Sequence, residues 1–374
     1  MRQRKRIINA VLGGGGIKGI AYAGVLSAAE KKHFIFGNMA GVSSGALAGS
    51  YIAAGYSAQE LRQILENFDF AKIKIDEIRK KVPAVQRFIE YRAGVRGNSF
   101  DALSSFIKTD WSNGKPRVSA NVEQTLHNDE QTLQEQSRNV IKNIITFSKE
   151  GALMDGDYLE EWVYITLNKK GIKTFGDIES GIPDRVNPKG RRIRMTAVDA
   201  NRGKVVVLPD DMTYYGIDPD KFEVAKAVRM STCVPFAFKP VQISFEKDGE
   251  KKTHLFVDGG VLDGFPGWLV SSSVRIPAAG FILDSGKKKL FSLDTPINIL
   301  KGLYIATHDI GVPKNYVKPP FIANIDTDKI SFLDFGIDEK DKKYLYDSGF
   351  KSGCKLFDMI ANNPLYSFVS RFFG

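Results

Sequence analysis

Hydrophobic and polar positions form a regular succession of blocks in the first part of the chain. Residues 6–12 are mostly apolar, which is typical of a buried strand, and residues 20–32 are small and apolar over the length of a helix. A second apolar run at 34–40 predicts another strand, and the small residues at 46–54 predict another helix. Two strands joined by a helix predict a parallel pair in a βαβ unit.

The pattern becomes polar in the middle of the chain and strand-like again after it. Between about 82 and 155, Asn, Gln, Ser and Lys become frequent, and apolar residues recur at helical spacing from Val140 to Ile145. We therefore expect a mostly helical insertion that caps the sheet. Further strands are expected at 192–199, 204–208, 254–257 and 277–283, and further helices at 57–68, 222–230 and 338–357.

This order of elements predicts an α/β fold with a mostly parallel central sheet. The chain has 374 residues, enough for one large domain with a sizeable core. We expect one domain over 1–290, with the helical cap inserted at about 82–155. The remaining residues, 291–374, are expected to form a helical extension packed on the same domain.

Composition adds one directional signal, an excess of positive charge. The chain is 43% hydrophobic and 26% charged, which is ordinary for a globular protein, but its net charge is +10. Such a charge favours an anionic partner, such as nucleic acid, an anionic membrane or an acidic ligand, and it also favours solubility. The lysines are interspersed with acidic residues and form no basic stripe, so we expect no nucleic-acid partner.

The cysteines and the N-terminal residues indicate in which cellular compartment the protein is expected. Cys233 and Cys354 are far apart and build neither a disulfide framework nor a zinc site, which fits a reducing compartment. The basic start precedes an apolar run too short for a signal peptide, and no stretch approaches the roughly 20 apolar residues of a membrane span. We expect a cytoplasmic protein, at most peripheral at a membrane, with no metal and no cofactor.

Candidate chemistry begins where the second predicted strand ends. The residues there are Gly41-Val-Ser43-Ser-Gly45, followed by the predicted helix. A Gly-x-Ser-x-Gly pattern between a strand and a helix is typical of a nucleophile elbow, in which the glycines permit a sharp turn. The turn exposes the Ser43 hydroxyl beside a helix N-terminus, where developing negative charge is favoured. By itself the five-residue pattern is also common in ordinary turns.

A glycine run, Gly13-Gly-Gly-Gly-Ile-Lys-Gly19, follows the first strand. Successive glycine amides can point into one concavity and hold an oxyanion, with Lys18 adding positive charge. The same residues fit the dinucleotide pattern Gly14-x-Gly16-x-x-Gly19, but that site needs an acidic residue at the end of the second strand, and none is there. A phosphate-binding Walker loop is excluded, because Lys18 precedes its glycine and Ile20 follows.

The nucleophile needs a base, and the sequence offers histidines and one well-placed carboxylate. The histidines are His33, His127, His254 and His308, and none lies in a glycine-rich loop at a strand end. Asp258 does, because it ends the apolar run 254–257 and precedes Gly259 and Gly260. By itself, Asp-Gly-Gly is more typical of a plain turn.

Together these motifs resemble the patatin-like phospholipase family. Their order matches, as does the short spacing between the first two, and residues 227–240 and 259–266 resemble the family's later blocks. The resemblance covers roughly residues 6 to 285. It implies a three-layer α/β/α fold and a Ser–Asp dyad, with Ser43 as nucleophile and Asp258 as base. It assigns the oxyanion loop to Gly14, Gly15, Gly16, Lys18 and Gly19, the elbow to Gly41 and Gly45, and the Asp-Gly-Gly motif to Gly259 and Gly260.

Two positions depart mildly from the family pattern, which often has aspartate at Gly13 and arginine at Lys18. The activity that the resemblance implies is a calcium-independent serine acyl hydrolase of the phospholipase A or lysophospholipase type. Its partner would be a membrane phospholipid or another acyl lipid, reached by contact with an anionic membrane. An activator and a homo-oligomer stay open. Alternatives are a carboxylesterase on soluble acyl esters and a catalytically silent lipid-binding protein.

Overall fold

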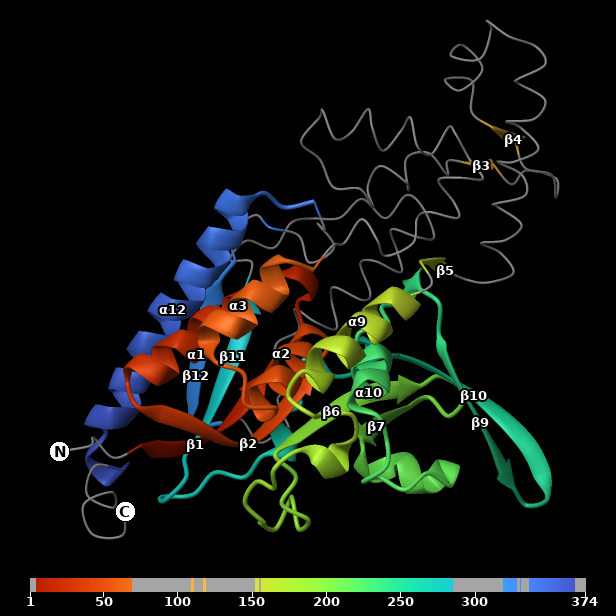
Figure 1. Ribbon diagram of the computed structural model, residues 1–374, viewed down its shortest axis with the longest axis horizontal. Coiled ribbons are helices and arrows are strands. Elements are labelled where there is room, and N and C mark those ends of the chain that lie inside the picture. Colours follow the sequence, from red (N-terminus) through yellow and green to blue (C-terminus); the bar gives the residue numbers. More distant parts are fainter. Residues whose placement is uncertain are drawn as a thin grey trace, which may run out of the picture.

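The structure is a computed structural model, and it describes residues 5–68, 109–110, 117–118, 152–154, 156–284, 319–327, 330 and 336–366. Its centre is an eight-stranded sheet in the order β12-β11-β1-β2-β6-β10-β9, with β7 paired to β6 (Figure 1). The strands are β1 (Arg6–Leu12), β2 (Phe34–Val42), β6 (Ile193–Asp199), β7 (Lys204–Leu208), β9 (Val241–Lys247), β10 (Glu250–Asp258), β11 (Ala278–Asp284) and β12 (Phe321–Asp326).

Most of this sheet is parallel. The strands from β12 through β11, β1 and β2 to β6 run parallel, whereas β10 and β7 are antiparallel to β6, and β9 is antiparallel to β10. Every residue of β6 is buried, as expected for a strand covered on both faces. This confirms the predicted α/β fold with a mostly parallel central sheet.

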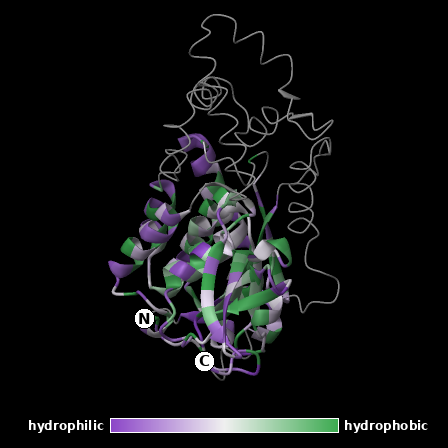
Figure 2. Cartoon of the chain, turned by 90° about the vertical axis from the view of Figure 1, so that its right-hand side faces the viewer, coloured by the Kyte–Doolittle hydropathy of each residue, from purple (hydrophilic) through white to green (hydrophobic). Residues whose placement is uncertain are grey.

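The described helices gather on one face of the sheet (Figure 1). They are α1 (Ala21–Lys31), α2 (Ser44–Ala53), α3 (Ala58–Glu66), α9 (Asp157–Asn168), α10 (Val224–Ser231) and α12 (Glu339–Asn362). The connections also contain short 3-10 turns: η1 (Gly16–Ile20), η4 (Phe175–Asp177), η5 (Asp210–Tyr215), η6 (Gly259–Val261) and η7 (Gly267–Leu269). A smaller apolar cluster, which includes Phe265, Leu269 and Val270, packs against Val11 and Ala40 of the sheet. Hydrophobic residues gather in the interior and hydrophilic ones at the periphery (Figure 2).

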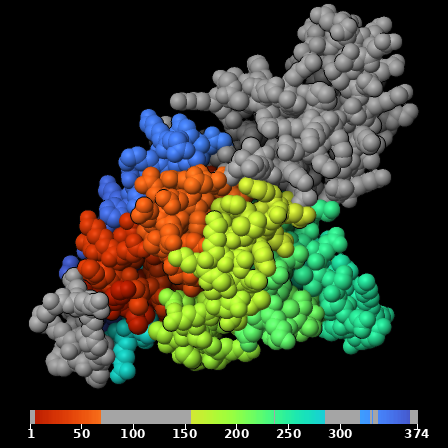
Figure 3. Space-filling model, viewed as in Figure 1, coloured from red at the N-terminus to blue at the C-terminus, as the bar shows by residue number. Residues whose placement is uncertain are grey.

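The C-terminal helix α12 lies against α1, although the two are far apart in sequence (Figure 3). Glycines make this contact close: a Cβ on Gly24 would lie 2.0 Å from the carbonyl oxygen of Tyr346, and one on Gly349 would lie 2.0 Å from that of Ala21. The ring of Phe357 stacks on Phe34 of β2 at a centroid distance of 4.9 Å. The last described helix is therefore part of the core over the sheet.

The helix expected from residue 57 begins as predicted. Ser57 caps α3, its hydroxyl accepting from the amide of Glu60 while the Glu60 carboxylate accepts from the amide of Ser57. This reciprocal pair satisfies two amides that a helix start leaves open. The strand expected at 254–257 is longer than predicted, because β10 forms a hairpin with β9 that begins at Glu250.

Most of the insertion expected at about 82–155 lies outside the described residues, so the helical cap stays a prediction. Three short strands are described within it: β3 (Thr109–Asp110) pairs with β4 (Arg117–Val118), and β5 (Ala152–Met154) pairs with β8 (Phe236–Phe238). Among the helices of the described ranges, none has the length and apolar character needed to cross a membrane.

Candidate active site

Ser43 lies in the sharp turn between β2 and α2. Its backbone angles are φ 54° and ψ −124°, and its residue surface is only 2% exposed. A non-glycine residue with positive φ is strained by about 1–3 kcal/mol and persists only where its surroundings hold it. The turn therefore has the geometry of a nucleophile elbow, with Ser43 as the N-cap of α2.

Both glycines of the elbow are needed for close backbone approach. A Cβ on Gly45 would lie 2.1 Å from the carbonyl oxygen of Leu12, and one on Gly41 would lie 2.5 Å from that of Gly45. Both obstacles are main-chain atoms, which cannot rotate aside. The contact of Gly45 with Leu12 also brings the elbow directly against the end of β1, where the glycine run starts.

The glycine run packs against the elbow. A Cβ on Gly19 would lie 2.7 Å from the Cβ of Ser44, so the side chain of Ser44 packs directly on the backbone of Gly19. Gly16 has φ 57°, a conformation that glycine adopts without strain. Lys18 follows within η1 and is buried.

The glycines of the run differ in whether their backbone amides donate hydrogen bonds. The amide of Gly13 donates to the carbonyl of Phe281 and the amide of Gly14 to that of Gly264. In the described part of the chain, the amides of Gly15 and Gly16 donate to no acceptor. Of the predicted oxyanion loop, Gly15 and Gly16 therefore have amides available for a ligand, while the amide of Gly14 is engaged.

Asp258 is the last residue of β10 and is 0% exposed. Its Oδ1 accepts from the amide of Gly260 at 2.7 Å, and its own amide donates to the carbonyl of Cys233 at 2.7 Å. Gly259 must be glycine, because a Cβ there would lie 2.5 Å from the carbonyl oxygen of Thr196. The Asp-Gly-Gly motif is therefore packed onto β6 and holds its carboxylate in the protein interior.

The sheet register brings Ser43 and Asp258 to the same end of the molecule. β6 lies between β2 and β10, with Val42 opposite Thr196 and Asp258 opposite Ala197. Ser43 follows Val42 directly. The two residues thus flank neighbouring positions of one strand, at the carboxyl edge of the parallel strands, where α/β proteins bind ligands.

A hydroxyl that sequence reasoning did not single out contacts the nucleophile. Ser231 Oγ, at the end of α10, accepts from the amide of Ser43 at 3.0 Å and donates to the carbonyl of Thr196 at 2.7 Å. Ser231 lies inside the block 227–240 that carries part of the family resemblance, but the block alone gives it no role. Only the folded structure joins it to Ser43.

The described histidines lie elsewhere. His254 Nδ1 is 2.7 Å from Asp199 Oδ2, and its ring packs edge-on against Phe245. It precedes Asp258 by four positions on β10, which is about 13 Å along a strand. His33 lies between α1 and the start of β2, at the opposite end of β2 from Ser43. His127 and His308 lie outside the described residues.

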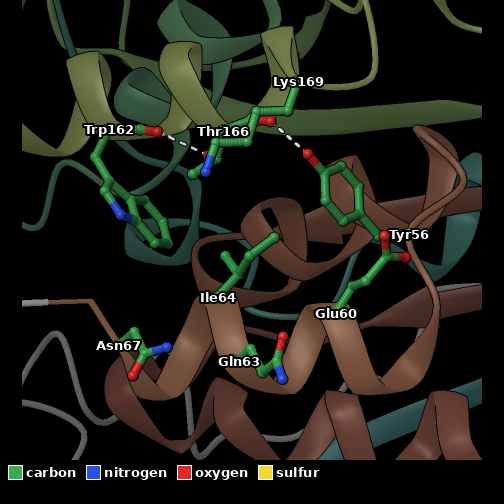
Figure 4. A pocket seen from close by; sticks show the side chains of 8 residues that line it. All are labelled: Tyr56, Glu60, Gln63, Ile64, Asn67, Trp162, Thr166 and Lys169. Atoms are coloured by element: carbon green, nitrogen blue, oxygen red, sulfur yellow. Dashed lines mark hydrogen bonds between the residues drawn. The ribbon is translucent and has the colours of Figure 1, made fainter.

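A cavity of about 310 Å³ lies between α3 and α9, apart from these residues (Figure 4). Its lining residues are Tyr56, Glu60, Gln63, Ile64, Asn67, Trp162, Thr166 and Lys169. The hydroxyl of Tyr56, in the connection just before α3, donates to the carbonyl of Thr166 in α9. None of the lining residues belongs to the elbow, the glycine run or the Asp-Gly-Gly motif. Within the described ranges, no three His, Cys, Asp or Glu side chains are grouped so that they could hold a metal ion.

Comparison with known proteins identifies the family. Residues 10–268 match the model of the patatin-like phospholipase family. The chain is also 30% identical over 276 residues to the uncharacterised protein YqhO of Bacillus subtilis (strain 168), an alignment that covers 74% of this chain and 71% of YqhO.

Two solved structures are similar at lower identity. VipD from Legionella pneumophila aligns with 95% of this chain and 67% of its own, at 14% identity and a TM-score of 0.45. The type III effector ExoU of Pseudomonas aeruginosa aligns with 95% of this chain, at 15% identity and a TM-score of 0.36, and the chain spans about half of ExoU, 54%. The family match and its extent confirm the resemblance seen in the motifs: the chain belongs to the patatin-like phospholipase family, whose members are lipid acyl hydrolases.

Proposed function

We propose that this protein is a serine acyl hydrolase that cleaves fatty-acyl esters of phospholipids, with Ser43 as nucleophile and Asp258 as its base. The observation that carries the proposal is the register of the sheet, which puts the elbow serine and a buried carboxylate on either side of β6 at one edge. In the glycine run packed against the elbow, the amides of Gly15 and Gly16 donate to no acceptor among the described residues and are available at the same place.

In the acylation step, Ser43 Oγ attacks the ester carbonyl carbon and its proton passes to the Asp258 carboxylate. The carbonyl oxygen becomes an oxyanion, which accepts hydrogen bonds from the amides of Gly15 and Gly16. The N-terminus of α2, which begins at Ser44, favours the same negative charge. When the tetrahedral intermediate collapses, the ester C–O bond breaks and the lysophospholipid leaves with the proton from Asp258.

In the deacylation step, Asp258 takes a proton from water, and the hydroxide oxygen attacks the acyl carbon on Ser43. The intermediate collapses, the fatty acid leaves, and Ser43 Oγ recovers its proton from Asp258. The chain's own groups carry every proton of the cycle, and we propose that calcium is dispensable.

The burial of both groups favours this chemistry. Ser43 is 2% exposed and Asp258 0% exposed, so little water competes for either. Burial disfavours the charged form of a carboxyl group and so makes its carboxylate a stronger base toward a serine hydroxyl. The same low dielectric strengthens the hydrogen bonds to the oxyanion.

The test is release of fatty acid from vesicles of phosphatidylcholine and phosphatidylglycerol, with EGTA present, by the parent, Ser43→Ala and Asp258→Asn. We expect release by the parent and a loss of about a thousandfold or more in each variant, because dyad members act as a unit. Asp263→Asn is the matched control: Asp263 is also buried near the site but accepts from the indole of Trp268, and its variant should keep activity within threefold.

Activity that survives in Asp258→Asn would contradict the assignment of the base. A carboxylesterase would hydrolyse a monomeric short-chain ester and leave vesicles intact, so both substrates are assayed. A silent lipid-binding protein would bind vesicles, release nothing and leave Ser43 unlabelled by a fluorophosphonate.

A further inference from the structure

We propose that Ser231 is a positioning residue, whose hydroxyl holds the backbone of Ser43 in the conformation needed for attack. This inference rests on the proposed function and deepens it, because it names the group that fixes the nucleophile. Ser231 itself touches neither substrate nor reacting atoms in this scheme.

The Ser231 hydroxyl forms hydrogen bonds with two main-chain groups. It accepts from the amide of Ser43 at 3.0 Å and donates to the carbonyl of Thr196 at 2.7 Å. A hydroxyl has one proton to donate, so its direction is set: it cannot also donate elsewhere. Ser231 is 0% exposed, so bulk water does not reach its hydroxyl in the folded protein.

Ser231 holds the backbone of Ser43, which is in a strained conformation. Ser43 has φ 54°, which a side-chain-bearing residue keeps only when surrounding contacts enforce it. The amide of Ser43 belongs to this strained residue, and the Ser231 hydroxyl accepts a hydrogen bond from it. The bond ties the elbow to β6 through Thr196, across 188 positions of sequence between Ser43 and Ser231.

The same stretch of chain also holds the other proposed catalytic residue. Two positions after Ser231, the carbonyl of Cys233 accepts from the amide of Asp258 at 2.7 Å. Residues 231–233 thus fix the backbones of Ser43 and Asp258 relative to each other above β6. Because the Ser43 amide donates to Ser231, it is not a donor to the oxyanion.

The test compares Ser231→Ala with Ser50→Ala. Ser50 is a matched control, since it is also 0% exposed and lies in α2, but its hydroxyl donates locally to the carbonyl of Leu47. In Ser231→Ala we expect kcat on phospholipid vesicles to fall about ten- to hundredfold with KM within twofold, because small displacements of a nucleophile are costly in rate. Ser50→Ala should keep kcat within twofold.

A second readout does not depend on any substrate. Hydrogen–deuterium exchange of the peptide that contains residues 41–45 should become about tenfold faster in Ser231→Ala and stay unchanged in Ser50→Ala. Ser231→Thr, which keeps the hydroxyl, should restore slow exchange and most of kcat. If Ser231→Ala fails to fold, Ser231→Thr compared with Ser231→Cys, whose thiol is a weak acceptor, gives the same contrast.

Equal exchange in Ser231→Ala and Ser50→Ala, or a kcat loss no larger than that of the control at equal folded fraction, would overturn the proposal. Failure of the proposed function looks different: the parent would release no fatty acid while the exchange contrast at 41–45 remained.

Discussion

Asp199 is a buried carboxylate that the fold keeps ionised. Burial raises its pKa, but hydrogen bonds from the Tyr215 hydroxyl at 2.6 Å and from the His254 ring at 2.7 Å, together with the Arg202 amide, outweigh burial and hold the pKa below its usual value. A depressed pKa means that the folded state prefers the charged form, so the carboxylate contributes stability above the unfolded-state pKa, near 3.9.

This sign gives a prediction for Asp199→Asn. The variant should have a smaller free energy of unfolding than the parent at pH 7, and the difference should narrow as the pH falls below about 4, because the parent then protonates Asp199 as well. Urea denaturation at pH 7 and at several values below 4 measures the difference. Asp248→Asn, on the exposed β9–β10 turn, is the control and should change stability little at any pH.

If the difference in free energy of unfolding between the parent and Asp199→Asn stays constant until the parent unfolds in acid, the stabilising role of the Asp199 charge is contradicted. Activity at pH 7 should remain in Asp199→Asn at equal folded fraction, because the residue lies apart from the proposed dyad.

Ser43 and Asp258 could be singled out from the sequence because their requirements are local. Glycines lie two positions before and after Ser43 and directly after Asp258, and the structure shows which backbone atoms Gly41, Gly45 and Gly259 approach. Ser231 could not be singled out, because its role depends on a contact with a residue 188 positions away. The sequence also could not predict which amides of the glycine run are engaged. This depends on the carbonyls of Phe281 and Gly264, which accept from the amides of Gly13 and Gly14.

At the scale of elements, the pairing of α1 with α12 depends on a backbone contact. Gly349 approaches the carbonyl of Ala21 so closely that a Cβ would lie 2.0 Å from its oxygen. Because the obstacle is main chain within a helix, a larger residue must push the two helices apart. Phe357 would then lose its stacking with Phe34, and α12 its place over the sheet.

We therefore predict that Gly349→Ala lowers the free energy of unfolding by about 1–3 kcal/mol or more, although alanine has the better helix propensity. Thermal and chemical denaturation measure the loss. Lys351→Ala, at an exposed position of the same helix, should differ from the parent by less than about 0.5 kcal/mol. A Gly349→Ala protein as stable as the parent would mean that the helices separate at no cost.

Most strands and helices were predictable, because the period of the apolar residues reports burial directly. The strand β12 was not, since it lies in the stretch 291–374 that was expected to be a helical extension. The order of the strands in the sheet could not be predicted, because the pairing of β6 with β2 and β10 joins segments that are separated by long stretches of chain. The sequence predicted that the extension packs on the domain, but it did not predict that α12 contacts α1, for the same reason. The cap expected at about 82–155 stays a prediction.

At the scale of the whole molecule, the net charge of +10 bears on how the site would meet its substrate. A cationic protein is attracted to anionic lipid by roughly 1 kcal/mol for each basic residue near the surface, and salt screens that attraction. The proposed function therefore carries an expectation about the vesicle surface, separate from the chemistry of the dyad.

We predict that binding to vesicles of phosphatidylglycerol weakens at least about tenfold between low salt and roughly 0.5 M salt. Co-sedimentation with Ser43→Ala measures binding without hydrolysis. Vesicles of phosphatidylcholine alone are the control and should bind weakly at both salt concentrations. Binding that is equal on both lipids and unaffected by salt would argue against an electrostatic contact.

The glycine contact between α1 and α12 also has a consequence for biosynthesis. The helix that follows the glycine run is made early, whereas its partner emerges after roughly 300 more residues, which takes about 15–60 s at ordinary rates of translation. Until then α1 lacks the surface that its small residues fit. The α1 helix therefore reaches its packed environment only after residues 339–362 have been synthesised.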